Sequence, residues 1–281
     1  MNSALLAAVA NTYRRINFSN LLSGLVAYWK LDETLGSRAD SSGNGYTLTE
    51  VGGTVYASPG VIKNSALFAN GPCLSASSVL NTSVDFTVSF WIHVLSSSTT
   101  NGSHLIGSPF DSGWFCQCVS NGSYLYYKVG FPFATNGMVV DNTPEDYTNF
   151  RHYVFTKTGN IITLYRNGGL VATQTISGYN FPIGARVFYM GSDNGQYPFN
   201  NGMIDEVGIW NRALSQTEAA EIYSLAKMKI SYPFQGDEVP SICLDPNATN
   251  CQCNTGYFWD GVACAPILSP SPAPAPSPGN S

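Results

Sequence analysis

The sequence predicts an all-β protein, built as a two-sheet antiparallel jelly-roll sandwich with a small disulfide-linked appendage near its C-terminal end. Short segments that alternate apolar and polar residues follow one another, separated by Gly, Asn and Asp turns. Charged residues make up only 11% of the 281 residues, while aromatic residues reach 13%. Strands favour aromatic and β-branched residues, so this composition is typical of an extracellular β protein.

The expected organisation has five parts: an N-terminal arm (1–20), a β body (21–228), a linker (229–241), a cysteine-rich module (242–265) and a Pro-rich tail (266–281). The arm contains a short apolar run that ends like a signal cleavage site. The run lacks a positively charged lead and is short for a signal, so we expect a helix or an extended docking arm. Alternating prolines in the tail favour a stiff, solvated polyproline II segment.

Ten strands are expected within the β body, at 25–31, 65–69, 86–94, 114–119, 124–129, 152–157, 161–166, 170–175, 187–190 and 203–210. In strand 86–94 the residues at even positions should face the core and those at odd positions should face outward. Asn167 and Gly168 can supply the positive φ angles of a tight hairpin turn. A helix should follow the last strand, because Ser215 and Glu218 form a capping-box pattern and Ala219, Ile222 and Leu225 form one apolar stripe.

Two segments of this chain resemble the signatures of laminin-G-like domains in the concanavalin A-like family. The opening one, GLVAYWKLDETLGSRADSSGNGYTLT (24–49), holds a buried aromatic, a D-E pair and a D-x-S-G-N-G turn. The closing one, FNNGMIDEVGIWNRALSQTEAAEIYSL (199–225), holds an acidic pair, an Asn-Arg turn and the capped helix. The resemblance implies a jelly roll used for recognition of glycans or proteins.

The same resemblance implies a structural calcium ion that ties the loop after the first strand to the last strand. The matching positions are Glu33, Asp40, Asn44 and Asp205. Calcium takes six to eight oxygen ligands, and carboxylates mixed with turn carbonyls suit it. The alternative is that Asp40 and Asn44 form an Asx-type turn and that Asp205 caps a backbone amide.

A glycan site would combine an exposed aromatic ring with a few amide and carboxylate partners. The candidates near expected loops and strand ends are Trp114, Tyr126, Asp193, Asn194 and Tyr197. For each aromatic taken singly, packing in the core is the competing interpretation.

Seven cysteines indicate an oxidising compartment. Cys243, Cys251, Cys253 and Cys264 resemble the second half of an EGF-like module, which implies the pairs Cys243–Cys251 and Cys253–Cys264. A zinc site is the alternative, although the segment has neither a C-x2-C pair nor a nearby His.

The other three cysteines cannot all pair with one another. Cys116 and Cys118 share one face of a strand, so one of them, Cys116 in our assignment, is expected to bridge to Cys73. The third is then free or pairs between chains.

Five N-x-S/T sequons are candidate glycosylation sites: Asn17, Asn81, Asn101, Asn121 and Asn247. Several such triplets arise by chance in a chain rich in Asn and Ser. Together with the cysteines they favour a secreted, cell-surface or virion-surface protein.

Several functions are excluded by the sequence. A net charge of -5 provides no basic footprint for nucleic acid, and no apolar run is long enough to span a membrane. Glucanases of this architecture place carboxylates at alternate positions of one strand. Here Asp205 and Glu206 are adjacent and are expected to point to opposite faces, so we predict no catalysis.

Two functional hypotheses remain. The first is a calcium-stabilised, lectin-like module that binds a polysaccharide or the glycans of a glycoprotein. The second is a structural subunit of a surface fibre or virion coat, in which the arm, the cysteine module and the tail contact neighbouring subunits. The fold does not decide between them.

Overall fold

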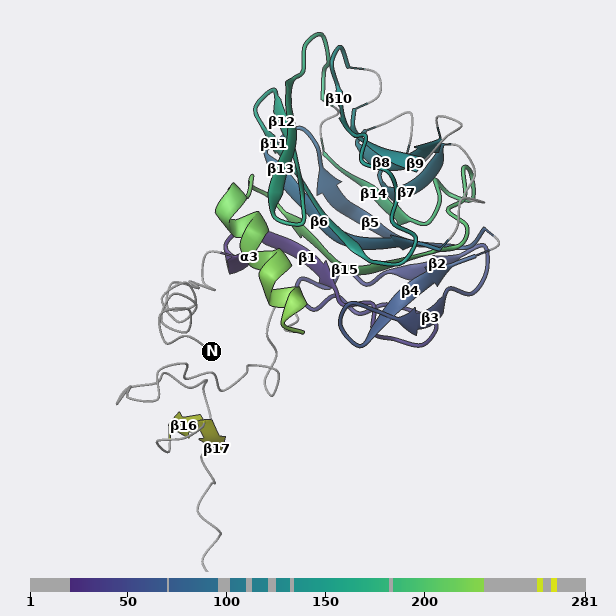
Figure 1. Ribbon diagram of the computed structural model, residues 1–281, viewed down its shortest axis with the longest axis vertical. Coiled ribbons are helices and arrows are strands. Elements are labelled where there is room, and N and C mark those ends of the chain that lie inside the picture. The colour runs from purple at the N-terminus through teal and green to yellow at the C-terminus, as the bar shows by residue number, and fades with distance from the viewer. Residues whose placement is uncertain are drawn as a thin grey trace, which may run out of the picture. The chain divides into compact units, whose positions relative to one another are not determined.

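A computed structural model describes residues 21–69, 71–95, 102–109, 113–120, 125–131, 134–181, 184–229, 257–259 and 264–266. The chain divides into two compact units. One unit, Asn17–Pro233, contains the β body (Figure 1). The other contains the short hairpin of β16 (Tyr257–Trp259) and β17 (Cys264–Pro266). No helix of the described residues is long and apolar enough to cross a lipid bilayer.

The β body consists of two antiparallel sheets that face each other (Figure 1). Sheet 1 has the order β13-β12-β11-β6-β15-β4-β3, and β1 also pairs with β15. Its strands are β1 (Leu25–Trp29), β3 (Tyr56–Pro59), β4 (Asn64–Phe68), β6 (Phe86–Val94), β11 (Arg151–Thr158), β12 (Ile161–Arg166), β13 (Gly169–Thr175) and β15 (Gly202–Trp210).

Sheet 2 has the order β10-β9-β8-β7-β14-β5-β2. Its strands are β2 (Thr49–Val51), β5 (Cys73–Asn81), β7 (Ser103–Gly107), β8 (Phe115–Ser120), β9 (Leu125–Gly130), β10 (Met138–Asp141) and β14 (Ala185–Met190). The predicted all-β, two-sheet jelly-roll sandwich is therefore confirmed.

The alternation predicted for β6 is also present. Phe86, Val88, Phe90 and Ile92 all lie in the central core, whereas Trp91 belongs to a second cluster on the outer face of sheet 1. Aromatic rings join the two sheets across the core: Trp29 of β1 stacks on Phe188 of β14 with ring centroids 5.4 Å apart. Burial of these large apolar side chains drives the two sheets together.

Helix α3 (Gln216–Lys227) has the predicted capping box, in which Ser215 and Glu218 bond each other's backbone amides. The helix lies over the outer face of sheet 1 (Figure 1), where Ala226 belongs to the cluster that contains Trp91 and Tyr223 packs against it. Tyr223 stacks on Trp91 at 5.4 Å, and the buried ring of His152 lies beside both. The helix thus covers the outer apolar cluster, which would otherwise face solvent.

Hairpin β12–β13 turns at Asn167 and Gly168, whose φ angles are +51° and +79° as predicted. Within the described part of the β body, five strands were missed: β2, β3, β5, β7 and β10. The longest of these, β5, has the sequence CLSASSVLN, in which Leu74, Ala76, Val79 and Leu80 face the core. A bulge shifts the register within it and breaks the alternation that would have revealed the strand.

A second bulge lies in β15, where Glu206 has a φ of +48° and the register with β6 shifts. Ile204 and Val207 on either side of the acidic pair both lie in the core. Asp205 and Glu206 therefore lie together on the outer side, so the expectation that they point to opposite faces was wrong. The extra residue of a bulge changes the alternation of side chains along a strand.

Candidate functional site

The best-defined candidate for ligand contact is the loop 191–201 between β14 and β15. Its sequence, GSDNGQYPFNN, carries a single charged residue, Asp193. Asp193 and Gln196 exchange two backbone hydrogen bonds of 2.9 and 2.8 Å, which close a tight turn. The Ser192 hydroxyl accepts a bond of 2.8 Å from the Gly195 amide. The loop is therefore rigidly built despite its polar composition.

Tyr197 is the exposed aromatic residue of this loop, with 52% of its surface accessible. Its φ is +49°, a left-handed conformation that is uncommon for a bulky residue and must be held by its surroundings. The His104 amide of β7 holds it through a 2.8 Å hydrogen bond to the Tyr197 carbonyl oxygen. Asn194, also exposed and at positive φ, lies on the same turn. The predicted residues Asp193, Asn194 and Tyr197 thus share one structured loop.

Trp114 and Tyr126, the other two residues predicted to contact a ligand, do not lie on this loop. Trp114 is completely buried and packs against Phe86 and Phe155 with centroid distances of 6.1 and 5.2 Å. Its prediction as a sugar-stacking residue was wrong, because a ring enclosed in the core cannot contact a ligand. The backbone of Tyr126 lies in β9, and its side chain lies outside the part that the structure describes.

The residues expected to bind calcium are instead engaged with backbone groups. Asp40 accepts bonds from the amides of Tyr28, Ser42 and Tyr46, at 3.0, 2.9 and 3.0 Å. These contacts fasten the loop after β1 to that strand. Asn44 donates to the carbonyl oxygen of Val26 at 2.9 Å.

The two remaining candidates behave in the same way. Glu33 accepts a 2.7 Å bond from the Ala39 amide. Asp205, fully buried, accepts bonds from the amides of Val61 (2.7 Å), Ile62 (3.3 Å) and Glu206 (2.9 Å). Within the described ranges, no three His, Cys, Asp or Glu side chains gather to hold a metal ion. The donors do not fit one shared site, and calcium binding stays a prediction.

The acidic pair of β15 is also unsuited to contact a substrate. Glu206 is buried and accepts a 2.5 Å bond from the Tyr28 hydroxyl, and Asp205 is enclosed by the β3–β4 turn. Burial raises the pKa of Asp205 well above its usual value, against the lowering effect of its backbone bonds. These carboxylates support the fold.

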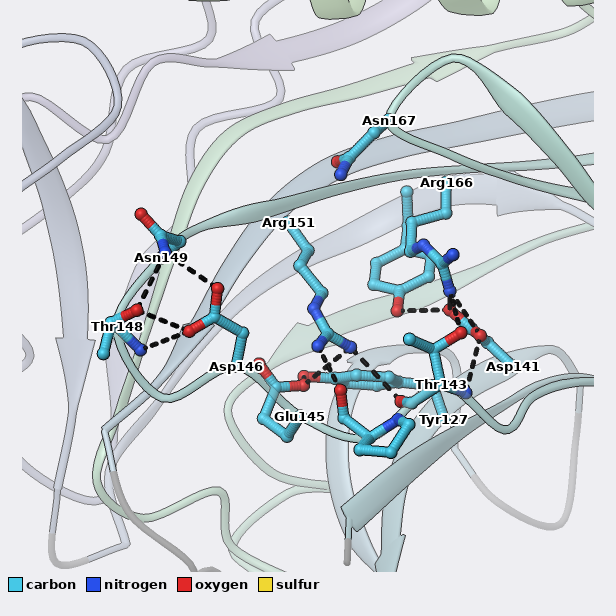
Figure 2. Close-up of polar contacts among 12 residues, drawn as sticks. Tyr127, Asp141, Thr143, Glu145, Asp146, Thr148, Asn149, Arg151, Arg166 and Asn167 are labelled. Atoms are coloured by element: carbon cyan, nitrogen blue, oxygen red, sulfur yellow. Dashed lines mark hydrogen bonds and ion pairs between the residues drawn. The ribbon is translucent and has the colours of Figure 1, made fainter.

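A polar network that the sequence did not suggest lies where the 142–150 loop passes from sheet 2 to sheet 1 (Figure 2). Asp141 at the end of β10 accepts two 2.6 Å bonds from Arg166 of β12 and a 2.8 Å bond from the Tyr153 hydroxyl. Burial raises the pKa of Asp141, but these bonds and those from Thr143 outweigh it and lower the pKa overall.

A second pair lies beside it. Glu145 accepts a 2.5 Å bond from the Tyr127 hydroxyl and lies 3.4 Å from the Arg151 guanidinium, as Figure 2 shows. Arg151 also donates to the carbonyl oxygens of Thr143 and Pro144. Burial raises the pKa of Glu145 although Tyr127 and Arg151 oppose it. Both cations are neutralised by neighbouring carboxylates, and the network holds the crossover loop.

The predicted Cys73–Cys116 disulfide is absent, and Cys73, Cys116 and Cys118 are all free and buried. Cys116 lies in register with Leu74, but two strands, β7 and β14, run between their strands. Three strand spacings amount to about 14 Å, roughly twice the Cα separation that a disulfide allows. Cys116 and Cys118 do share the core face as predicted, whereas Cys73 does not belong to that core cluster.

Several predicted sites lie outside the described residues. Asn17, Asn101, Asn121, Asn247, Cys243, Cys251 and Cys253 are among them, as are the arm, the linker and the Pro-rich tail. Cys264 is described only by its backbone position in β17, so the EGF-like pairing stays a prediction. Among the sequons, Asn81 is described: its side-chain oxygen accepts bonds from the amide and hydroxyl of Ser83.

Comparison with known proteins identifies the fold. The family model described as the concanavalin A-like lectin/glucanases superfamily (Laminin_G_3) matches residues 69–220, more than half of the chain. No curated protein sequence matches the chain.

Solved structures resemble it at low identity. Domain 4 of AbnA, a GH43 extracellular arabinanase from Geobacillus stearothermophilus, in complex with arabinotriose, is 20% identical with a TM-score of 0.56, and the match covers 72% of this chain and 98% of that domain. A botulinum neurotoxin type C structure, described as dependent on two ganglioside molecules for cell entry, is 16% identical with a TM-score of 0.57, over 75% of this chain and 53% of the other. The binding domain of botulinum neurotoxin DC in complex with rat synaptotagmin II is 17% identical with a TM-score of 0.56, over 72% and 52%. This chain thus spans about half the length of the matched toxin chains.

Proposed function

Because this chain belongs to the concanavalin A-like lectin/glucanase superfamily, we propose that it is a non-catalytic glycan-recognition protein of the cell exterior. The ligand contacts the loop 191–201, with the ring of Tyr197 stacked on the face of a sugar. The exposed Asn194 then supplies polar groups for sugar hydroxyls, whereas Asp193, only 9% exposed, helps to hold the turn through its backbone bonds to Gln196.

The observation that carries this proposal is the half-exposed aromatic ring on a backbone-fastened loop. A flat aromatic surface covers the apolar face of a pyranose, and amide and carboxylate groups at its rim satisfy the hydroxyls. The loop is held in place before a ligand arrives, so little conformational entropy is lost on binding. With one charged residue in eleven, the loop suits a neutral sugar.

The similar structures lend support. The AbnA domain was solved with arabinotriose bound, and the type C toxin is described as interacting with gangliosides. The binding domain of botulinum neurotoxin DC was solved in complex with a protein, rat synaptotagmin II, so a protein ligand is the alternative. Catalysis lacks support, because the acidic pair of β15 is buried and engaged in hydrogen bonds.

The proposal is tested on an array of neutral and charged polysaccharides, followed by titration of the best ligand. Tyr197→Ala should weaken binding about fivefold, since aromatic stacking contributes roughly 1 kcal/mol. Tyr197→Phe should retain most of the affinity because the ring remains. Both variants keep a non-glycine residue at the same positive φ, so the backbone strain is unchanged.

The matched control is Tyr56→Ala. Tyr56 lies on edge strand β3 and is 61% exposed, so its removal deletes a similar area of exposed ring elsewhere on the surface. Binding should be unaffected by this change. An array without any bound glycan, or equal losses in the Tyr197 and Tyr56 variants, contradicts the proposal.

A further inference from the structure

Two cations occupy inward positions at the end of the sandwich opposite to loop 191–201. Lys157 of β11 pairs with Phe86 at the start of β6, whereas loop 191–201 leads into Gly202 opposite Val94 at the end of β6. Lys157 continues the inward series of β11, after Tyr153 and Phe155, which lie in the core. It is almost completely buried.

Arg186 takes the corresponding place in sheet 2. It lies near the start of β14, two residues before the core residue Phe188, while Val187 between them is exposed. Its own side chain is partly buried. Cations from the two opposing sheets therefore project into the same end of the molecule.

Aromatic rings lie close to both cations. The Lys157 ammonium lies 4.2 Å from the ring centroid of Phe181. Phe181 meets the rings of Tyr179 and Phe131 at 5.1 and 4.9 Å. The charge of Arg186 acts on Tyr179, where it lowers the phenol pKa against the larger raising effect of burial. Tyr179 and Phe181 are both partly exposed.

The positive charge here has few protein partners. The Lys157 ammonium donates one hydrogen bond of 3.2 Å, to the Val84 carbonyl oxygen. Arg186 Nε is buried without a hydrogen-bond partner, and in the described residues neither side chain forms an ion pair. Burial lowers the pKa of Lys157, and the charge of nearby Asp85, whose carboxylate also accepts the Gly159 amide at 2.7 Å, opposes this only in part. Buried charges are normally paired with an opposite charge. Carboxylates outnumber cations in this chain, with 18 acidic residues against 13 basic ones, yet neither of these two cations has one as an ion-pair partner in the described residues.

We propose that Arg186 binds the anionic group of a glycan, a carboxylate or a sulfate, while the charge of the buried Lys157 adds to the attraction and Tyr179 and Phe181 contact the attached sugar ring. An arginine binds such oxyanions through paired hydrogen bonds. The site differs from the Tyr197 loop in position and in ligand chemistry, and it does not rest on that loop's function. The net charge of -5 disfavours unspecific binding of polyanions to this chain. Any attraction of a polyanion must therefore come from the local positive charge of Arg186 and Lys157.

The test uses the full chain with three probes: polygalacturonate for carboxylates, dextran sulfate for sulfates, and neutral dextran. The wild type should bind one of the two polyanions, weakly at high salt, and should not bind dextran. Arg186→Gln should weaken this binding about tenfold. Lys227→Gln, which removes one exposed positive charge from α3, should change it by less than about twofold.

Further variants separate the sites. Tyr179→Ala should also weaken polyanion binding, whereas Tyr197→Ala should leave it intact even if it abolishes binding of a neutral glycan. Arg186 is preferred to Lys157 as the test position because Lys157 is more deeply buried and its replacement affects folding. Absence of polyanion binding, or equal affinities of the Arg186 and Lys227 variants, overturns the proposal.

Discussion

At the residue scale, Asp205 fastens the β3–β4 turn to β15 through its bonds to the amides of Val61 and Ile62. In Asp205→Ala these two amides lose their acceptor inside the protein, and a buried unsatisfied donor costs about 1–3 kcal/mol. We expect the free energy of unfolding to fall by about 3 kcal/mol, measured by urea denaturation with calcium and with a chelator. The loss should be equal in both, because protein groups make all the contacts described. A loss seen only with calcium would instead support the calcium site.

Arg166 is a second residue whose role follows from one contact. It neutralises Asp141, whose side chain is 2% exposed. Arg166→Gln leaves this carboxylate without its cation, so we expect a loss of roughly 3 kcal/mol at pH 7. The folded-state pKa of Asp141 is lowered, so its stabilising contribution is present above the unfolded pKa of about 3.9 and is lost as the pH falls below it. Urea unfolding of both proteins should therefore differ more at pH 7 than near pH 3, because the contribution shrinks as the pH falls towards the lowered folded-state pKa. An equal difference at both pH values would contradict the assignment.

Single aromatic residues show why a candidate site is hard to predict. Trp114 and Tyr197 both stand next to glycine, serine or proline in polar segments. Trp114 is enclosed between the sheets, whereas Tyr197 is half exposed. That difference depends on which distant strands surround each residue, and local sequence does not encode it. The Asx turn at Asp40 was predictable as an alternative because all its partners but one lie within six residues.

At the scale of elements, α3 depends on its first turn. The Ser215 hydroxyl accepts from the Glu218 amide at 3.3 Å, and the Glu218 carboxylate accepts from the Ser215 amide at 2.8 Å. Ser215→Ala should lower the free energy of unfolding by about 1 kcal/mol. Ser224→Ala is the matched control: this exposed hydroxyl only bonds back to the Ala220 carbonyl, and its loss should change stability by less than about 0.5 kcal/mol. Equal losses in the two variants would contradict the capping role.

Elements with a local pattern were predictable and the others were not. Strand β6 and hairpin β12–β13 alternate regularly or carry an Asn-Gly turn, and their predicted bounds of 86–94 and 161–166 agree with the structure. Strands β5 and β7 contain bulges, and β2 and β3 are short edge strands. Pairing with neighbouring strands imposes their conformation: β5 and β7 both pair with β14, β2 pairs with β5, and β3 pairs with β4. Such pairing adds backbone hydrogen bonds whatever the side-chain pattern.

At the scale of the whole molecule, the sequence predicted the two-sheet architecture. It did not predict which residues meet at each end of the sandwich. Lys157 stands at an inward position of β11, where alternation predicts an apolar residue. That irregularity was visible in the sequence, but the Phe181 ring that the ammonium contacts belongs to a segment more than twenty residues away. The sequence also suggested a Cys73–Cys116 disulfide, because Cys116 and Cys118 share one face of a strand. The order of the strands in sheet 2 excludes this pair.

Two histidines buried in opposite sheets make the stability of the whole β body depend on pH. Burial lowers the pKa of both His104 and His152 to about 3, whereas a histidine in the unfolded chain titrates near 6.5. Below pH 6.5 the unfolded state therefore binds two protons that the folded state does not. The free energy of unfolding should fall by about 1.4 kcal/mol per pH unit for each histidine between pH 6.5 and 3.

His152→Gln tests this dependence. The glutamine amide can keep the hydrogen bond that the imidazole shares with the Ser89 hydroxyl at 2.8 Å, but it cannot be protonated. Loss of the stacking contacts with Trp91 and Tyr223 should lower stability at pH 7. Between pH 6 and 4.5, however, the decline should be shallower by about 1.4 kcal/mol per pH unit than in the wild type. Urea denaturation at four pH values measures both slopes. Parallel profiles would show that His152 becomes protonated in the folded protein, which requires that solvent reach the space beneath α3.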